Sequence, residues 1–264
     1  MKQFDINNYK FNTNSKIGIY LIHGFTSTTY ELKVLASFLK NKNYHVILNN
    51  LPGHGTTIED CNNSKYQDWL DYSKIELAKL CSQTDSVFIV GCSMGGVIGL
   101  YLASLFPISG LIVGGVVLQF KLYFSTYYLN TVLCHFIKTR EKKLAFPKEL
   151  RDSMDFYGYQ EYPLKALNEF RKMNKFVKKN LHKITAPSLI IHSNNDQVSI
   201  RQNVDIIYTR IKSQVKQILE VKHASHNLFD TNPMVSRLDP EGTFKFNLAV
   251  FMFLLFRSRS YSCR

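Results

Sequence analysis

The sequence predicts an α/β fold, in which a mostly parallel β-sheet carries helices on both of its faces. Short apolar runs of strand length alternate with amphipathic segments of helical periodicity, a pattern typical of sheets buried on both sides. The 264 residues are 45% hydrophobic and 20% charged, which provides ample apolar material for one core. We therefore expect a single folded domain that spans 1–264, and disorder as the main state is excluded.

The first half of the chain supplies strands and helices in alternation. Each expected strand is a short apolar run, and most of the expected helices have apolar side chains at helical spacing. The last of these helices is instead rich in small residues, which suits tight packing on a sheet. The expected strands are 16–22, 45–48, 86–90 and 111–118, and the expected helices are 29–41, 67–80 and 94–106.

The regular pattern stops at Gln119 and resumes at Ser188. The stretch 119–180 is aromatic, basic and irregular, so we expect it to form a small cap inserted into the α/β domain. Beyond it the expected elements are a strand at 188–192, a helix at 203–211, a strand at 217–221 and a last apolar segment at 244–256.

The chain carries a net charge of +13, and the inserted stretch contributes a large share of it. Residues 119–180 hold 13 Lys and Arg against 6 Asp and Glu, a balance of +7. An acidic acyl-carrier protein or an anionic lipid surface would suit such a face, although a solvated, Lys-rich exterior is the simpler explanation. No nucleic-acid-binding motif accompanies the charge, which disfavours nucleic acid as a partner.

Cysteine usage and hydropathy indicate the compartment. The five cysteines are odd in number and lack CxxC spacing, which disfavours a disulfide framework or a zinc site and favours a reducing environment. Residues 1–16 are polar and lack the apolar core of a signal peptide. The longest apolar stretch, 247–256, is too short for a transmembrane helix, which needs about 20 residues. We therefore expect a cytoplasmic protein with no transmembrane segment and no bound metal.

A serine lies in the sharp turn between an expected strand and an expected helix. The sequence Gly91-Cys92-Ser93-Met94-Gly95 follows the strand at 86–90 and leads into a helix, which is the setting that a G-x-S-x-G nucleophile elbow requires. Glycines flank the serine because a Cβ atom there would collide with the backbone. The helix begins at Met94, so its positive dipole end lies beside the serine. We expect Ser93 to be a nucleophile and the Met94 N–H to stabilise an oxyanion.

A serine nucleophile needs a general base, and the base needs an orienting acid. In a fold with this elbow the acid and base follow the serine in the order Asp, His. Asp196 comes directly after an expected strand, whereas Asp205 falls inside an expected helix and would face solvent. His226 lies in the loop after the next expected strand, with His223 as the alternative in the same loop. We expect Asp196 and His226 to complete the site.

A second loop has the composition of an oxyanion-binding turn. The front loop, His23-Gly24-Phe25-Thr26, follows the first strong strand. Gly24 lets the backbone approach a substrate, and the N–H of Phe25 would then be the second oxyanion donor. We expect His23 to organise this loop by hydrogen bonds rather than to transfer protons, and His54, in the turn Pro52-Gly53-His54-Gly55, to support it.

Taken together, these motifs resemble the α/β-hydrolase superfamily, and within it the small bacterial carboxylesterases and monoacylglycerol-lipase-like enzymes. The resemblance covers about residues 16–230 and also includes Gly96 and Pro107-Ile108-x-Gly110. It implies an eight-stranded, mostly parallel sheet, a small cap, and hydrolysis of carboxylic esters without metal or cofactor. The chain departs from the family at Ser225, where the family usually has glycine, and at 244–264, which does not resemble the usual closing amphipathic helix.

The resemblance implies two-step ester hydrolysis through an acyl-enzyme on Ser93. Aromatic residues of the inserted stretch suit short-to-medium acyl chains or monoacylglycerol-like lipids, although the same residues would also pack a cap onto the core. Two alternatives stay open: a hydrolase of esters or thioesters on an acyl-carrier protein that docks on the basic face, and a non-catalytic binding protein with this fold. The candidate substrate-binding residues are Tyr123, Phe124, Tyr127 and Tyr128.

Overall fold

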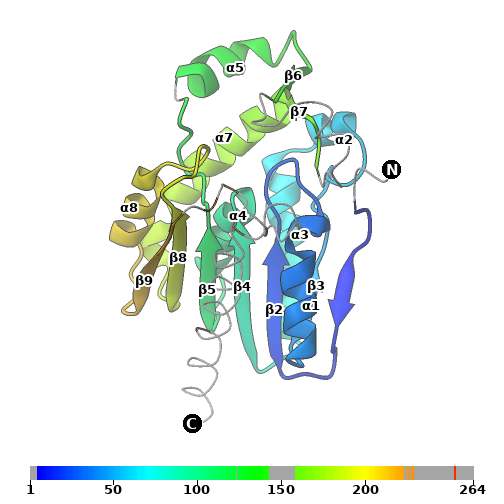
Figure 1. The fold of residues 1–264 in the computed structure, drawn as a ribbon, viewed down its shortest axis with the longest axis vertical. Helices are drawn as coiled ribbons and strands as arrows, with labels where there is room; N and C mark the ends of the chain where they lie inside the picture. The colour runs from blue at the N-terminus through cyan, green and yellow to red at the C-terminus, as the bar shows by residue number, and fades with distance from the viewer. Residues whose placement is uncertain are drawn as a thin grey trace.

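The computed structural model describes residues 5–122, 124–142, 158–222, 224, 226, 228 and 253. The strands among them form a seven-stranded sheet in the order β1-β3-β2-β4-β5-β8-β9 (Figure 1). Strand β1 runs antiparallel to β3, and every other neighbouring pair in this sheet is parallel. The mostly parallel α/β architecture is therefore confirmed, with seven strands in the main sheet of the described residues where the resemblance implied eight.

The strands and helices mostly begin and end close to the residues that the sequence predicts. The main sheet contains β1 (Tyr9–Phe11), β2 (Ile17–Ile22), β3 (His45–Leu48), β4 (Ser86–Cys92), β5 (Gly110–Gly114), β8 (Ser188–Ser193) and β9 (Lys216–Val221). The helices outside the insertion are η1 (Thr29–Leu32), α1 (Lys33–Asn41), α2 (Ile58–Asn63), α3 (Tyr66–Cys81), α4 (Met94–Ala103) and α8 (Arg201–Arg210).

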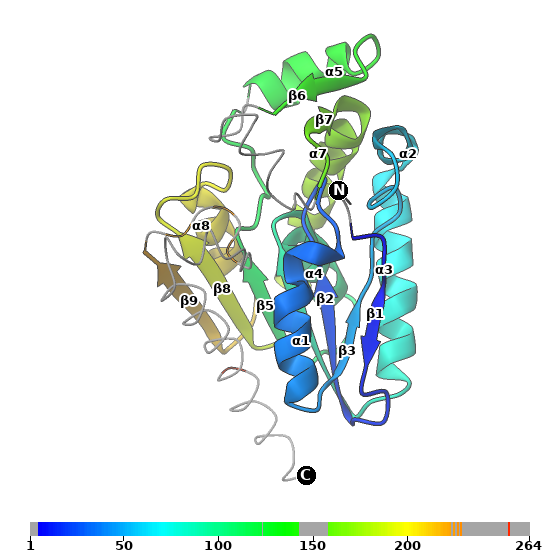
Figure 2. The same ribbon diagram turned by 45° about the vertical axis from the view of Figure 1, so that its right-hand side comes forward.

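Helices cover both faces of the sheet, and successive side chains of the central strands enter two different cores. On β2, Ile19 and Leu21 pack into the core that contains α1 and Phe253, whereas Tyr20 and Ile22 face the core formed with α3, α4, α7 and α8. Figure 2 shows α1 in front of the sheet and α3 and α4 behind it. Burial on both faces explains why these strands are continuous apolar runs.

The chain leaves the sheet after β5 and returns to it at β8. The intervening segment, called the insertion, contains a turn of π-helix η2 (Ser125–Leu129), α5 (Asn130–Leu133), the antiparallel pair β6 (Thr139–Glu141) and β7 (Glu161–Pro163), α7 (Leu164–Lys178) and the short η3 (Leu181–Lys183). In both views α5 and β6 lie at the top of the molecule, beyond one end of the main sheet. The role of this segment as a cap stays a prediction.

Two buried asparagines anchor this segment to the α/β domain. Asn174 of α7 donates from Nδ2 to the carbonyl of Val117 at 2.8 Å. Asn203 of α8 accepts the Gln119 N–H at 2.7 Å and donates to the Gln119 carbonyl at 3.0 Å. Both amides are buried, so they replace the hydrogen bonds with water that these backbone groups lose on folding.

Several expectations were wrong in detail. The strand expected at 111–118 ends at Gly114, because Gly115 has a φ of +56° and turns the chain out of the sheet. The stretch expected to be irregular contains the 15-residue helix α7. The edge strand β1 and the short helix α2 were not expected, since neither has an apolar repeat of its own. The apolar segment expected at 244–256 lies outside the described residues, except for Phe253.

Within the described part of the chain, no helix has both the length and the apolar character needed to cross a bilayer.

Candidate active site

Ser93 lies at a strained turn between β4 and α4. Its φ of +52° falls in the left-handed region, which a residue with a side chain adopts only when its surroundings impose it. A Cβ atom on Gly95 would lie 2.1 Å from the Ile22 carbonyl oxygen, and one on Gly91 would lie 2.4 Å from the Gly95 carbonyl oxygen. Gly95 therefore lets the turn pack directly against the end of β2, and Gly91 lets the end of β4 pack against the start of α4. A strained strand–turn–helix of this kind is what a nucleophile elbow requires.

The structure brings Ser93, His226 and Asp196 into one hydrogen-bonded chain. His226 Nδ1 lies 2.9 and 2.8 Å from the two carboxylate oxygens of Asp196, and His226 Nε2 lies 3.0 Å from Ser93 Oγ. A carboxylate can only accept hydrogen bonds, so Nδ1 carries the ring proton and Nε2 accepts from the serine hydroxyl. This tautomer is the one that a histidine base needs.

Backbone donors fix the Asp196 carboxylate at the end of β8. Its Oδ1 accepts the N–H groups of Val198 and Ser199, both at 2.8 Å, and its side chain is fully buried. The buried Ser193, the last residue of β8, hydrogen-bonds the Ala224 carbonyl and so ties this strand to the loop that carries His226. Asp205, the alternative acid, is exposed on α8 and pairs with Arg201.

The front loop runs along the elbow. A Cβ atom on Gly24 would lie 3.2 Å from Ser93 Cβ, so a side chain there would crowd the serine. The Gly24 carbonyl accepts from His23 Nδ1 at 2.9 Å and from the Ser27 N–H at 3.3 Å. In a trans peptide the N–H points opposite to the carbonyl, so the Phe25 N–H points away from both of these donors. Met94 is the first residue of α4, and its N–H has no acceptor within the helix.

His23 is a structural element of this loop. Its Nε2 accepts the Leu51 N–H at 3.0 Å, so Nδ1 carries the proton that binds the Gly24 carbonyl. Complete burial lowers the pKa of His23 to about 4, because protonation would break the bond from Leu51 and place a charge away from water. The geometry agrees with the expectation that His23 organises the loop.

His54 supports the same loop from the opposite side. Its Nδ1 donates to the Pro52 carbonyl at 3.1 Å, and its ring packs against His23, Phe25 and Trp69. The other ring nitrogen, Nε2, is buried and has no hydrogen-bond partner among the described residues. Burial, with the nearby His23 as a smaller cause, lowers the pKa of His54 to about 3.

The buried carboxyl of Glu31, which was not predicted from the sequence, hydrogen-bonds the backbone of the front loop. Glu31 of η1 accepts the Gly24 N–H at 2.6 Å and is 5% exposed. Burial raises the pKa of Glu31, and the Gly24 N–H acts in the opposite direction. The sequence did contain a signal for a buried carboxyl at Glu31. This acidic residue directly precedes the apolar helical repeat that starts at Leu32, so its position turns towards the core.

The aromatic residues proposed for substrate binding do not share one environment. Phe124 and Tyr128 are exposed, and their ring centroids lie 5.5 Å apart. Tyr127 packs its ring edge against Phe120, with Arg171 over its face. Tyr123 lies outside the described residues, as does His223. The role of these aromatic residues stays a prediction.

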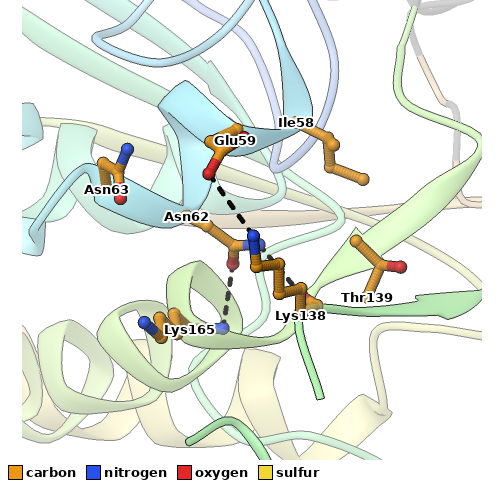
Figure 3. A pocket seen from close by; sticks show the side chains of 7 residues that line it. All are labelled: Ile58, Glu59, Asn62, Asn63, Lys138, Thr139 and Lys165. Carbon is orange, nitrogen blue, oxygen red and sulfur yellow. Dashed lines mark hydrogen bonds and ion pairs between the residues drawn. The ribbon is translucent and has the colours of Figure 1, made fainter. Parts of the chain in front are cut away.

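A small surface pocket lies where the insertion meets α2 (Figure 3). Asn62 closes it by donating to the Lys138 carbonyl at 2.9 Å and accepting the Lys165 N–H at 3.0 Å, and Glu59 pairs with the Lys138 side chain at 3.6 Å. These bonds fasten β6 and α7 to α2. The other lining residues are Ile58, Asn63 and Thr139.

The chain matches the family described as serine aminopeptidase, S33, over residues 13–232. It is 29% identical over 216 residues to the thermostable monoacylglycerol lipase of Bacillus sp. (strain H-257), covering 81% of this chain and 84% of that protein. It is 22% identical over 209 residues to the carboxylesterase of Bacillus subtilis (strain 168), covering 79% and 83%.

Among solved structures, the monoacylglycerol lipase of Paleococcus ferrophilus superposes with a TM-score of 0.77 at 19% identity, covering 96% of this chain and 100% of that one. The similarity confirms the α/β-hydrolase fold.

The two neutral histidines predict a loss of stability in mild acid. The pKa of a histidine in the unfolded chain is 6.5. A histidine whose pKa is lowered in the folded state therefore binds fewer protons in the folded than in the unfolded protein. The contribution of these two histidines to the free energy of unfolding is therefore fully present above pH 6.5. It falls as the pH drops towards 4, by up to about 1.4 kcal/mol per pH unit for each histidine. Urea unfolding between pH 7.5 and 5 measures this slope.

The variant His54→Asn keeps an N–H donor for Pro52 and removes the titrating ring. We expect a shallower dependence of unfolding free energy on pH in this variant than in the wild type. Equal slopes in the two proteins would contradict the assignment of His54 as a buried neutral histidine.

Proposed function

The chain belongs to the family described as serine aminopeptidase, S33, and from that premise we propose that it hydrolyses carboxylic esters through Ser93, His226 and Asp196. It is an enzyme, a serine hydrolase of the lipase and esterase type that acts on ester bonds. Our assignment of residues rests on the hydrogen-bonded chain from Ser93 Oγ through His226 to Asp196. Ser93 also has the strained, positive φ that a nucleophile elbow requires.

In the first step, His226 Nε2 takes the Ser93 hydroxyl proton while Oγ attacks the ester carbonyl. Asp196 stabilises the imidazolium that forms, because its carboxylate already accepts the Nδ1 proton. The C–O bond to the alcohol then breaks, and His226 gives the proton to the leaving oxygen. Water attacks the acyl-enzyme by the same route and releases the acid with a free serine.

Negative charge develops on the carbonyl oxygen in both steps, and two backbone groups are suited to stabilise it. The N–H of Met94 belongs to the first residue of α4. The N–H of Phe25 points away from the donors that hydrogen-bond the Gly24 carbonyl. Both groups are fixed before substrate arrives, so little reorganisation accompanies the reaction. We assign them as the oxyanion hole.

The substrate class follows from the relatives and from the insertion. One relative is named a monoacylglycerol lipase and another a carboxylesterase. We propose short-to-medium acyl esters or monoacylglycerol-like lipids as substrates. Neither relative is named for a carrier-bound substrate, so a role on an acyl-carrier protein has no support from them. The non-catalytic alternative does not agree with membership of a hydrolase family. A cytoplasmic location stays a prediction.

An apolar surface on the insertion suggests where the lipid comes from. Phe136 is 81% exposed and Leu122 is 64% exposed, whereas most large apolar side chains of a folded protein are buried. Exposed basic residues, among them Lys121 and Arg140, lie next to these side chains in the chain. We propose that this surface docks on anionic lipid. Its other exposed apolar members are Phe124, Tyr128, Leu129, Val132, Leu133 and Ile137.

Hydrolysis of p-nitrophenyl esters of increasing chain length tests the proposed chemistry. The variant Ser93→Ala should lose turnover by a factor of about 10⁴ or more, because the nucleophile is gone while the fold is kept. The wild type should prefer short-to-medium chains. Retention of most of the activity in folded Ser93→Ala would overturn the role of Ser93.

Co-sedimentation with vesicles tests the lipid surface. The wild type should bind vesicles that contain phosphatidylglycerol more strongly than vesicles of phosphatidylcholine alone, and added salt should weaken that binding. The double variant Val132→Ser/Phe136→Ser should bind several-fold less, whereas Ile75→Ser, which changes an exposed apolar residue on α3, should bind as the wild type does. Equal binding by all three proteins, or equal binding to both vesicles, would contradict the docking surface.

A further inference from the structure

A lysine of the insertion reaches the front loop in the interior of the protein. Lys142 directly follows β6 and is 8% exposed. Its Nζ donates to Thr26 Oγ1 at 2.6 Å, across 116 residues of sequence. We propose that Lys142 is a positioning residue for ester hydrolysis, which holds the front loop so that the Phe25 N–H meets the oxyanion. The inference rests on the function proposed above.

The hydrogen bonds run in one direction from the lysine to the loop backbone. Thr26 Oγ1 accepts from Lys142 and donates its own proton to the Phe25 carbonyl at 2.6 Å. A hydroxyl has one proton to donate, so the ammonium leaves it free to bind that carbonyl. Hydrogen bonds in such a chain strengthen one another. The lysine therefore acts on the peptide group that follows the proposed oxyanion donor.

The backbone at Thr26 requires this support. Its φ of +62° is left-handed, which is unfavourable for a β-branched residue and persists only where surrounding contacts impose it. The chain just before β7 holds the same residue, because the Tyr159 N–H donates to the Thr26 carbonyl at 2.8 Å. The segments that follow β6 and precede β7, at one end of this antiparallel pair, therefore both hold one residue of the front loop.

Close packing keeps this arrangement in place. A Cβ atom on Gly158 would lie 2.2 Å from the Thr26 carbonyl oxygen, so the insertion backbone rests directly on the loop. The Lys142 N–H also bonds the Gln160 carbonyl at 3.3 Å, which extends the pairing of β6 with β7 by one position. A shift of β6 and β7 would move Thr26 with them.

Burying a lysine is costly unless neighbours compensate. Lys142 Nζ lies 5.2 Å from the centre of the Tyr162 ring, and the charged form of Lys142 is favoured by Cys61 and by the buried Glu31 carboxyl, which binds Gly24 on the same loop. Burial still lowers the pKa of Lys142 to about 7. The charged and neutral amines both carry N–H donors, so the bond to Thr26 exists in either form.

These properties separate positioning from ordinary stabilisation. Removing one partner of a buried polar or ionic contact generally lowers stability. A lysine that served stability alone would therefore, when replaced by methionine, lower Tm and leave kcat unchanged in the folded protein. A positioning lysine instead gives a slower enzyme at temperatures where the variant is fully folded.

The experiment measures kcat, KM and Tm for Lys142→Met with a p-nitrophenyl ester. Loss of a direct oxyanion donor costs roughly 10²- to 10³-fold in kcat, and a misplaced donor costs less, so we expect a fall of about tenfold with KM nearly unchanged. The control Lys172→Met removes an exposed lysine of the insertion that pairs with Glu169, and it should keep the wild-type kcat.

Variants of Thr26 identify the route. Thr26→Ser keeps the hydroxyl and should keep most of the rate, whereas Thr26→Ala should lose rate as Lys142→Met does. The double variant Lys142→Met/Thr26→Ala should be no slower than either single variant, because both changes break one chain. If Lys142→Met does not fold, the comparison of Thr26→Ser with Thr26→Ala decides the question by itself.

The proposal would be overturned by any of three results. Lys142→Met keeps the wild-type kcat, the losses of kcat in the two single variants multiply in the double variant, or Thr26→Ser and Thr26→Ala have equal rates. Failure of the proposed function looks different, because the wild type would then show no ester hydrolysis that depends on Ser93. A wild type that needs Ser93 and ignores Lys142 would reject the positioning role alone.

Discussion

The close approach of the β4–α4 turn to the end of β2 is the constraint on which the site depends. A Cβ atom on Gly95 would lie 2.1 Å from the Ile22 carbonyl oxygen, so only a glycine lets the two backbones meet. That contact places the front loop, which begins one residue after β2, beside Ser93. The strained φ of Ser93 is a consequence of the same packing, and it directs the hydroxyl to His226.

Buried polar groups then fix the loop without offering competing chemistry. His23 and His54 are held neutral by burial, and each has a carbonyl acceptor on its protonated nitrogen. Glu31 holds Gly24 from the α/β domain, and Lys142 holds Thr26 from the insertion. The loop is therefore fixed from both sides by charged or ionisable groups in a region that water does not reach, where electrostatic interactions are strongest.

The order of strands made the main residues of the site predictable from sequence. Ser93, Asp196 and His226 each follow a strand of the same parallel sheet, and the carboxyl ends of such strands meet at one edge. The structure brings these three side chains together, although their roles stay a proposal. Glu31 and Lys142 gave no comparable signal, because their importance comes from contacts across 7 and 116 residues of sequence.

The fold was predictable where a segment packs on the sheet and less so elsewhere. The strands β2, β3 and β4 are predictable because each is a continuous apolar run, as a strand buried on both faces is expected to be. The helix α7 was missed because aromatic and basic residues around it hid an amphipathic repeat, and the edge strand β1 was missed because it has three residues and no buried one.

The most direct test of the central claim is covalent labelling with diethyl p-nitrophenyl phosphate, followed by peptide mapping. The reagent reacts with an activated serine and releases p-nitrophenol, so labelling can be compared with loss of esterase activity in one sample. We expect one label per chain, on Ser93, with activity lost in proportion and labelling much slower in His226→Ala. A label on another residue, or esterase activity that survives complete labelling of Ser93, would contradict it.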